Sequence, residues 1–191
     1  MGELISDDNS LSKHIQAILE HPLVDIYAIK KANFKVVVDA INSSGAFTVP
    51  ALLKAIGVED IIVLNAEMTG DFAHNPEPLK EHLTELCDTV LKEKAHLGIA
   101  VDPDVDRLCF VSEDGNLFGE EYTLVAVADY ILQYTKGTTV SNLSSTRALR
   151  DVTEQHGCTY FASAVGEVNV VTKMKSEKAV IGGEGNGGII V

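Results

Sequence analysis

The sequence predicts an α/β protein of two tandem related units, each a mixed, mostly parallel small sheet packed between helices. Helical and strand patterns alternate along the whole chain, an order that favours parallel strands joined by helices. In addition, two stretches of the sequence resemble each other at an offset of 100 residues, from Asn42 to Asn142. The first is VVVDAINSS, followed by a helix, a glycine and DIIVLNA. The second is TTVSNLSS, followed by a helix, a glycine and TYFASAV. The second copy stops one or two elements earlier than the first copy predicts, so we expect the second unit to be truncated.

The first unit is expected to cover residues 1–112. Apolar residues at helical spacing predict a helix over Leu11–Leu19, and a β-branched run between polar turns predicts a buried strand over Phe34–Ala40. A helix over Phe47–Ile56 would end at Gly57, a favourable helix terminator. The remaining expected elements are the strand Asp60–Ala66, the helix Pro78–Lys94 and the strands Leu97–Val101 and Leu108–Ser112.

The second unit is expected to cover residues 113–191. It opens with a polar turn at 113–116 and a strongly apolar helix over Glu120–Tyr134. The strand and helix pattern of the first unit then returns. The expected strands are Thr138–Leu143, Cys158–Ala164 and Ala179–Ile181, and the expected helices are Thr146–His156 and Val168–Ser176.

The composition limits the classes of partner. The net charge is −13, from 15 Lys and Arg against 28 Asp and Glu, and no basic run is present. Because a phosphate backbone is bound by clustered Lys and Arg, we expect no nucleic-acid partner. No apolar run approaches the roughly 20 residues of a membrane helix, so we expect no membrane contact. The polar N-terminus is unlike a signal peptide and the three cysteines form no CxxC pair, which together favour reduced thiols in the cytoplasm.

The aspartate-rich sequence GIAVDPDVDRLCF, residues 98–110, is the sharpest motif. A buried strand runs directly into Asp102, Asp104 and Asp106, and Arg107 and another apolar strand follow. Alternate residues of an extended chain point the same way, so the three carboxylates converge if the loop curls. Close carboxylates repel one another, and a hard divalent cation relieves that repulsion. Oxygen-only ligands favour Mg²⁺, Mn²⁺ or Ca²⁺ over zinc.

Three other interpretations of this motif are open. A solvated acidic turn is disfavoured because the motif sits between two apolar strands. An EF-hand loop would need glycine where Arg107 stands, and helices instead of strands on its flanks. A phosphatase of the haloacid-dehalogenase type, with Asp102 as nucleophile, would need a later acidic motif that we do not find.

A glycine-rich sequence near the end of the chain offers a second candidate site. In GGEGNGG, residues 182–188, Glu184 and Asn186 are the only side chains. The glycines let backbone approach a ligand closely. A carboxylate and a carboxamide can bind adjacent hydroxyls, which suits a sugar. The motif lacks the Lys-Ser/Thr pair of a P-loop and the following helix of a dinucleotide-binding turn.

Together these motifs resemble the α-D-phosphohexomutase family, which includes phosphoglucomutases, phosphomannomutases and phosphoglucosamine mutases. Asp-Pro-Asp-Val-Asp-Arg at residues 102–107 is similar to the family's Asp-Gly-Asp-Gly-Asp-Arg metal loop. Gly-Glu-Gly-Asn-Gly-Gly at residues 183–188 is similar to its Gly-Glu-x-Ser-Gly-His sugar loop. His-x-Pro-x-Pro at residues 74–78 and Val-Gly-Glu at residues 165–167 add support. The resemblance covers residues 11–191 and corresponds to the second domain and part of the third.

The resemblance implies a four-domain isomerase with its site in a central cleft. Asp102, Asp104 and Asp106 would hold Mg²⁺ against a phosphoserine that gives its phosphate to a phosphorylated hexose, through a bisphosphorylated sugar. Arg107 would contact the phosphate, and Glu184 and Asn186 would bind the sugar hydroxyls.

The sequence departs from the family pattern at several positions. Pro103 and Val105 replace two glycines, so we expect the loop to use φ values that these residues tolerate. Asn186 replaces serine, Gly188 replaces histidine, and Ser144 stands where some members have a lysine. We therefore assign no general base.

Two parts of the family pattern, the phosphoserine motif and the last domain, are not found in this sequence. His74-Asn75-Pro76 matches the end of the Thr-Ala-Ser-His-Asn-Pro phosphoserine motif, but Ala73 stands in place of the serine. We interpret these residues as a helix-start turn. The chain is thus expected to be an inactive fragment that needs the missing domains of the same enzyme. The alternatives are a small Mg²⁺-dependent phosphosugar phosphatase using Asp102, and a non-catalytic sugar- or metal-binding module.

Overall fold

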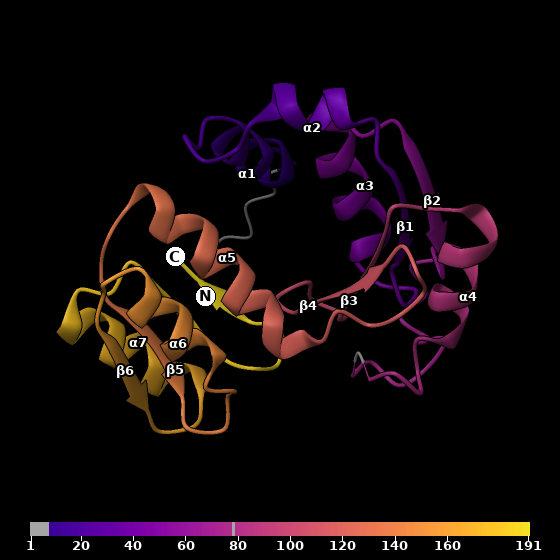
Figure 1. Ribbon diagram of the computed structural model, residues 1–191. Coiled ribbons are helices and arrows are strands. Elements are labelled where there is room, and N and C mark those ends of the chain that lie inside the picture. The colour runs from indigo at the N-terminus through magenta and orange to yellow at the C-terminus, as the bar shows by residue number, and fades with distance from the viewer. Residues whose placement is uncertain (1–7, 78) are drawn as a thin grey trace, which may run out of the picture.

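The computed structural model describes residues 8–77 and 79–191, and it contains two four-stranded sheets flanked by helices (Figure 1). The first sheet has the order β2-β1-β3-β4. The strands β1, β2 and β3 are parallel, and β4 runs antiparallel to β3. Their bounds are Lys35–Asp39 for β1, Asp60–Leu64 for β2, Leu97–Val101 for β3 and Leu108–Ser112 for β4.

Alternating side chains of β1 divide the first core between two helices. Val37 packs with Leu86 and Val90 of α4 (Thr84–Glu93) on one face of the sheet. Val36 and Val38 pack with Leu53 of α3 (Gly45–Ala55) on the other face. Because successive strand residues point to opposite faces, a strand covered on both sides must be apolar throughout, as VVV is here.

The second sheet repeats this plan with the order β6-β5-β7-β8. Here β5, β6 and β7 are parallel and β8 is antiparallel to β7. The helices α5 and α6 cover one face and α7 covers the other. The strands are β5 (Thr139–Asn142), β6 (Tyr160–Ser163), β7 (Ile181–Gly183) and β8 (Ile189–Ile190), and the helices are α5 (Glu120–Tyr134), α6 (Ala148–Gln155) and α7 (Glu167–Glu177).

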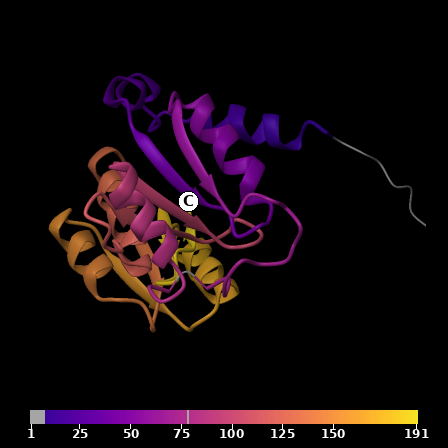
Figure 2. The same ribbon diagram turned by 90° about the vertical axis from the view of Figure 1, so that its right-hand side faces the viewer.

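The helix α5 joins the two units. Figure 1 shows it between the sheets, where it contacts β4 of the first unit and β7 of the second. Figure 2 shows the indigo and purple segments of the first unit above the orange-to-yellow second unit. Two surface helices precede the first sheet, α1 (Ser10–Leu19) and α2 (Ile26–Ala32). Within the described residues, no helix combines the length and apolar character needed to cross a bilayer.

The predicted fold class is confirmed, with corrections to single elements. The expected helix from Pro78 is wrong over residues 79–83, because α4 begins only at Thr84, and Pro78 itself lies outside the described residues, as do residues 1–7. The helix α2 and the strand β8 were not predicted. The expectation that the second unit stops one or two elements early is wrong, because its sheet has a counterpart for each strand of the first sheet, although the last strand has only two residues.

The parallel strands deliver three loops to one edge of the first sheet. Residues 40–44 follow β1, residues 65–77 follow β2, and residues 102–107 follow β3. Ligands of open α/β sheets bind beyond the carboxyl ends of the strands. This edge therefore brings the aspartate motif to the position where a site is expected.

Candidate functional site

The loop at residues 102–107, which we call the metal loop, brings its three carboxylates together. One oxygen each of Asp102, Asp104 and Asp106 lies within 4.8 Å of the others. Asp102 is buried at the end of β3, whereas Asp104 and Asp106 are exposed. The sequence predicted that these side chains converge, and this geometry agrees with that prediction.

Backbone hydrogen bonds to Asp102 close the metal loop. The N–H groups of Asp106 and Arg107 both donate to Asp102 Oδ1, at 3.1 Å each. The N–H of Val105 donates to the carbonyl of Asp102 at 3.1 Å, which forms a turn. Asp102 therefore shapes the loop with one carboxylate oxygen and leaves the other oxygen available.

Val105 has a φ of +63°, in the left-handed region. We expected valine to impose a φ that β-branched residues tolerate, and that expectation is wrong. The loop keeps the conformation that glycine would adopt easily, because the hydrogen bonds to Asp102 require it.

The serines after β1 also hold the metal loop. Ser43 Oγ and Ser44 Oγ both donate to the carbonyl oxygen of Pro103, at 2.7 Å each. Both serines are partly buried in the loop at residues 40–44. The metal loop is thus attached to the neighbouring strand as well as to its own.

The electrostatics of the metal loop favour a cation. Burial raises the pKa of the Asp102 carboxyl, and the nearby Asp106 and Asp104 carboxylates raise it further, against the backbone hydrogen bond from Arg107. A hard divalent ion would relieve this repulsion, and three carboxylates offer the oxygen ligands that Mg²⁺ prefers. The residues present therefore fit Mg²⁺.

Arg107 lies beside the carboxylates without a close ion pair. Its Nε is 3.9 Å from Asp102 Oδ2 and 3.9 Å from Asp106 Oδ1, and 42% of its side chain is exposed. Pairs at that distance and exposure contribute little to stability. The guanidinium is consequently available to an anionic ligand.

The loop at residues 183–188, which we call the sugar loop, is anchored through its glutamate. Glu184 Oε1 accepts hydrogen bonds from Asn142 Nδ2 and from the N–H of Gly166, the latter at 2.9 Å. The N–H of Gly185 donates to Ser145 Oγ at 2.9 Å, and Ser145 Oγ donates to Asn142 Oδ1 at 2.7 Å. One carboxylate oxygen of Glu184 thus holds the loop, and the other is left for a ligand.

Asn186 uses only part of its hydrogen-bonding capacity in contacts with the rest of the protein. Its Oδ1 accepts a hydrogen bond from the N–H of Gly188 at 3.1 Å, and no bond from its Nδ2 is present among the described residues. The amide group is therefore available as a donor.

The two loops line the same pocket. Asp106 and Arg107 of the metal loop and Glu184 and Asn186 of the sugar loop all line it. Gly187 brings the loops into contact, because a Cβ on this residue would collide with the carbonyl oxygen of Leu108, the residue after the metal loop. Backbone thus packs directly on backbone across the two units.

Several residues at the site were not predicted. Glu167, at the first turn of α7, lines the pocket shared by the two loops. Asn142, which is buried, supports the sugar loop. Glu77 lines an adjoining pocket with Arg107 and Asn186. The sequence predicted Asn142 near the end of a strand. Because ligands bind beyond the ends of parallel strands, that position was the signal that could have identified Asn142 as a site residue.

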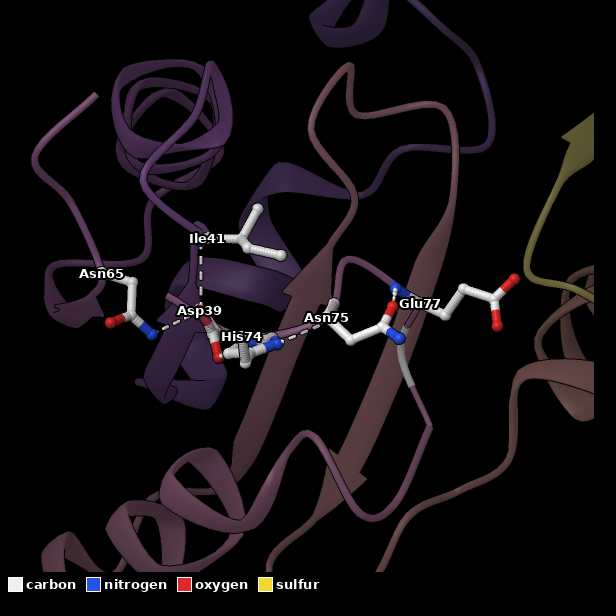
Figure 3. A network of polar contacts seen from close by, with 6 residues as sticks. All are labelled: Asp39, Ile41, Asn65, His74, Asn75 and Glu77. Carbon is white, nitrogen blue, oxygen red and sulfur yellow. Dashed lines mark hydrogen bonds and ion pairs between the residues drawn. The ribbon is translucent and has the colours of Figure 1, made fainter. Parts of the chain in front are cut away.

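His74 has a different role from the expected helix-start turn. That interpretation is wrong, because α4 begins ten residues later, at Thr84. His74 Nε2 instead lies 2.9 Å from Oδ2 of the buried Asp39, at the end of β1 (Figure 3).

Comparisons with known proteins place the chain in a family. Residues 12–115 match "Phosphoglucomutase/phosphomannomutase, alpha/beta/alpha domain II", and residues 119–191 match "alpha/beta/alpha domain III" of the same family. A probable phosphoglucosamine mutase of Methanopyrus kandleri is 35% identical over 97% of this chain and 40% of its own length. A phosphoglucomutase/phosphomannomutase of Thermococcus kodakarensis is 35% identical over 100% of this chain and 41% of its own length.

Solved structures share the fold. A putative phosphomannomutase of Thermus thermophilus superposes with a TM-score of 0.88 at 24% identity, covering 99% of this chain and 44% of its own. An Aspergillus fumigatus N-acetylphosphoglucosamine mutase, solved in complex with GlcNAc-6P and magnesium, superposes with a TM-score of 0.55 at 16% identity, over 87% and 38% of the two chains. The chain spans about two fifths of the curated relatives. It belongs to the phosphoglucomutase/phosphomannomutase family, the α-D-phosphohexomutases, and contains that family's second and third α/β/α domains.

Proposed function

We propose that this chain supplies the metal loop and the sugar loop of a phosphohexomutase. The complete enzyme interconverts hexose 1-phosphate and hexose 6-phosphate through a phosphoserine and a bisphosphorylated sugar. The observation that carries the proposal is the pocket shared by Asp106, Arg107, Glu184 and Asn186. The pocket therefore offers a guanidinium suited to a phosphate together with a carboxylate and an amide suited to sugar hydroxyls.

Each predicted residue has a role consistent with its surroundings. Asp102, Asp104 and Asp106 would hold Mg²⁺, which would neutralise charge on a transferred phosphoryl group. Arg107 presents a planar set of donors to the phosphate. Glu184 and Asn186 orient the sugar hydroxyls with the groups that their loop contacts leave available.

The isolated chain is proposed to lack mutase activity. The phosphoserine and the last domain belong to parts of the enzyme outside this chain, which spans about two fifths of its relatives. Its partners are accordingly a phosphorylated hexose and the missing domains of the same enzyme. We place the boundary between the two units at residues 112 and 113, and the enzyme in the cytoplasm, which suits its free cysteines.

A chimera tests this function. The chain replaces the corresponding two domains of the Thermococcus kodakarensis relative, which it matches along its full length. We expect the chimera to convert hexose 1-phosphate to hexose 6-phosphate with Mg²⁺, and the isolated chain not to do so. Asp104→Asn in the chimera should remove most of the activity, and Asp114→Asn, in the turn after β4, serves as a matched control.

The phosphatase alternative gives the opposite result. If the isolated chain released phosphate from a hexose phosphate with Mg²⁺, and Asp102→Ala abolished that release, the chain would be a complete phosphatase. A well-folded chimera without mutase activity would leave the sugar- or metal-binding module as the better description.

A further inference from the structure

The carboxylate of Asp39 joins three segments at the carboxyl edge of the first sheet. Asp39 is 2% exposed and takes no part in the proposed chemistry. Its Oδ1 accepts the N–H of Ile41 at 3.1 Å and Nδ2 of Asn65 at 3.0 Å, and its Oδ2 lies 2.9 Å from Nε2 of His74 (Figure 3). Ile41 lies in the turn after β1, Asn65 begins the connection after β2, and His74 lies farther along that connection. One buried carboxylate therefore fixes the separation of these segments.

The ring of His74 is held from both sides. Its Nδ1 lies 2.8 Å from the carbonyl oxygen of Asn75, so both ring nitrogens face oxygen atoms. The side chain of Asn75 then accepts the N–H of Glu77 at 3.0 Å. Figure 3 shows the Glu77 side chain directed away from Asp39, and Glu77 lines a pocket with Arg107. His74 thus orients the segment that forms one wall beside the metal loop.

A second connection runs from Asp39 to the metal loop itself. The bond from Asp39 to the N–H of Ile41 sets the turn after β1, where Ile41 and Asn42 have φ values of +48° and +56°. The next two residues, Ser43 and Ser44, donate their hydroxyls to the carbonyl oxygen of Pro103. The position of the metal loop consequently depends on the turn that Asp39 holds.

We propose that Asp39 and His74 are a positioning pair, which sets the geometry of the metal loop and of the Glu77 wall without touching ion or substrate. The proposal rests on the proposed function of the metal loop. Removal of the His74 ring leaves the buried carboxylate with one donor fewer, and the turn at residues 40–44 rearranges to compensate. Partners behind ligand loops act in this way because they fix the ligands' orientation.

Three variants test the proposal. His74→Ala removes the donor, and His74→Gln retains an amide donor that can reach Asp39. His96→Ala is the matched control, because His96 Nδ1 accepts the N–H of Lys35 at 2.9 Å at the opposite end of the same sheet. If His74→Ala fails to fold, Asn65→Ala removes another donor from the same carboxylate and takes its place.

Amide hydrogen exchange without metal provides the first measurement. In His74→Ala we expect exchange at Asp106 and Arg107 to accelerate roughly tenfold. Exchange at Gly115, in the turn after β4, should stay constant. His74→Gln should restore protection, and His96→Ala should leave Asp106 and Arg107 unchanged. Unchanged exchange in His74→Ala, or equal acceleration in both alanine variants, would overturn the proposal.

Titration with Mn²⁺ provides the second measurement. His74→Ala should weaken binding roughly tenfold, with recovery in His74→Gln and no change in His96→Ala. Full affinity in His74→Ala would contradict the positioning role. If the parent chain binds no metal, the proposed function of the loop fails, and the exchange experiment still decides whether the pair positions it.

Discussion

Val105 adopts a left-handed backbone conformation in the middle of the metal loop, with a φ of +63°. The two residues that follow it, Asp106 and Arg107, both donate their N–H groups to Asp102 Oδ1. A residue with a Cβ is strained in this conformation, and a β-branched one most of all. The loop keeps this conformation together with the two hydrogen bonds to Asp102 Oδ1.

A pair of substitutions measures this strain. Val105→Gly and Val105→Ala both remove the valine's packing, but only glycine relieves the left-handed conformation. We expect the glycine variant to be more stable than the alanine variant by about 1 kcal/mol, the reverse of the order in ordinary secondary structure. Urea unfolding of the two proteins provides the free energies. An alanine variant that matched or exceeded the glycine variant would show that the loop relaxes to a negative φ.

We expect the thiol of Cys109 to be the least reactive of the three cysteine thiols. Burial raises its pKa to about 12, and the charge of Glu120 adds to the shift. The thiolate fraction is therefore roughly a thousandfold below that of an ordinary cysteine. At pH 8 we expect iodoacetamide to modify the partly exposed Cys158 in the folded protein, and Cys109 only after unfolding. Mass spectrometry of digests distinguishes the two, and equal rates would contradict the buried environment.

Among the structural elements, the contact between the sugar loop and β4 links the two units. Gly187 has a φ of +89°, and a Cβ there would collide with the Leu108 carbonyl oxygen and lie 3.0 Å from the Leu108 nitrogen. Both atoms are backbone and belong to a paired strand, so neither can move aside easily. The close approach places the sugar loop against the metal loop.

Substitution of this glycine should be costly. We expect Gly187→Ala to lower the free energy of unfolding by about 2 kcal/mol or more, through backbone strain and the clash with Leu108. Gly188→Ala is the control, because its Cβ would meet only the Asn186 side chain, at 3.2 Å. Thermal and urea unfolding compare the two. Equal losses would mean that the loops are not packed as described.

The elements that the sequence predicted well are those with a strong local pattern. The helix α5 has the expected bounds, Glu120–Tyr134, because a long apolar segment lies between polar turns. The start of α4 was misplaced because residues 79–83 carry helix-forming side chains, but the carbonyls of Leu79 and Lys80 accept N–H groups three residues later, as in turns. The helix α2 is short and buries no residue, and β8 has two residues, so neither leaves a clear periodic pattern.

The same contrast holds for the candidate site. The Asp-x-Asp-x-Asp spacing predicted converging carboxylates because loop and strand geometry determine it locally. The contacts between Asp39 and His74, and between Glu184 and Asn142, join residues 35 and 42 positions apart. Such contacts depend on the order of strands in the sheets, which a single sequence does not specify. The φ of Val105 opposed local preference and was predicted wrongly for that reason.

At the scale of the whole molecule, two copies of one sheet plan meet so that their carboxyl-edge loops share a pocket. The first unit provides Asp106 and Arg107, and the second provides Glu184 and Asn186. Neither unit alone supplies all four of these side chains. The pocket is therefore a product of the arrangement, with α5 in contact with both sheets.

The most direct test is a crystal structure of this chain soaked in Mn²⁺, which scatters anomalously and takes the oxygen ligands that suit Mg²⁺. We predict one anomalous peak in the metal loop, roughly 2.2 Å from an oxygen of each of Asp102, Asp104 and Asp106. No peak there, with the three side chains turned apart, would contradict the proposed metal site and the function built on it.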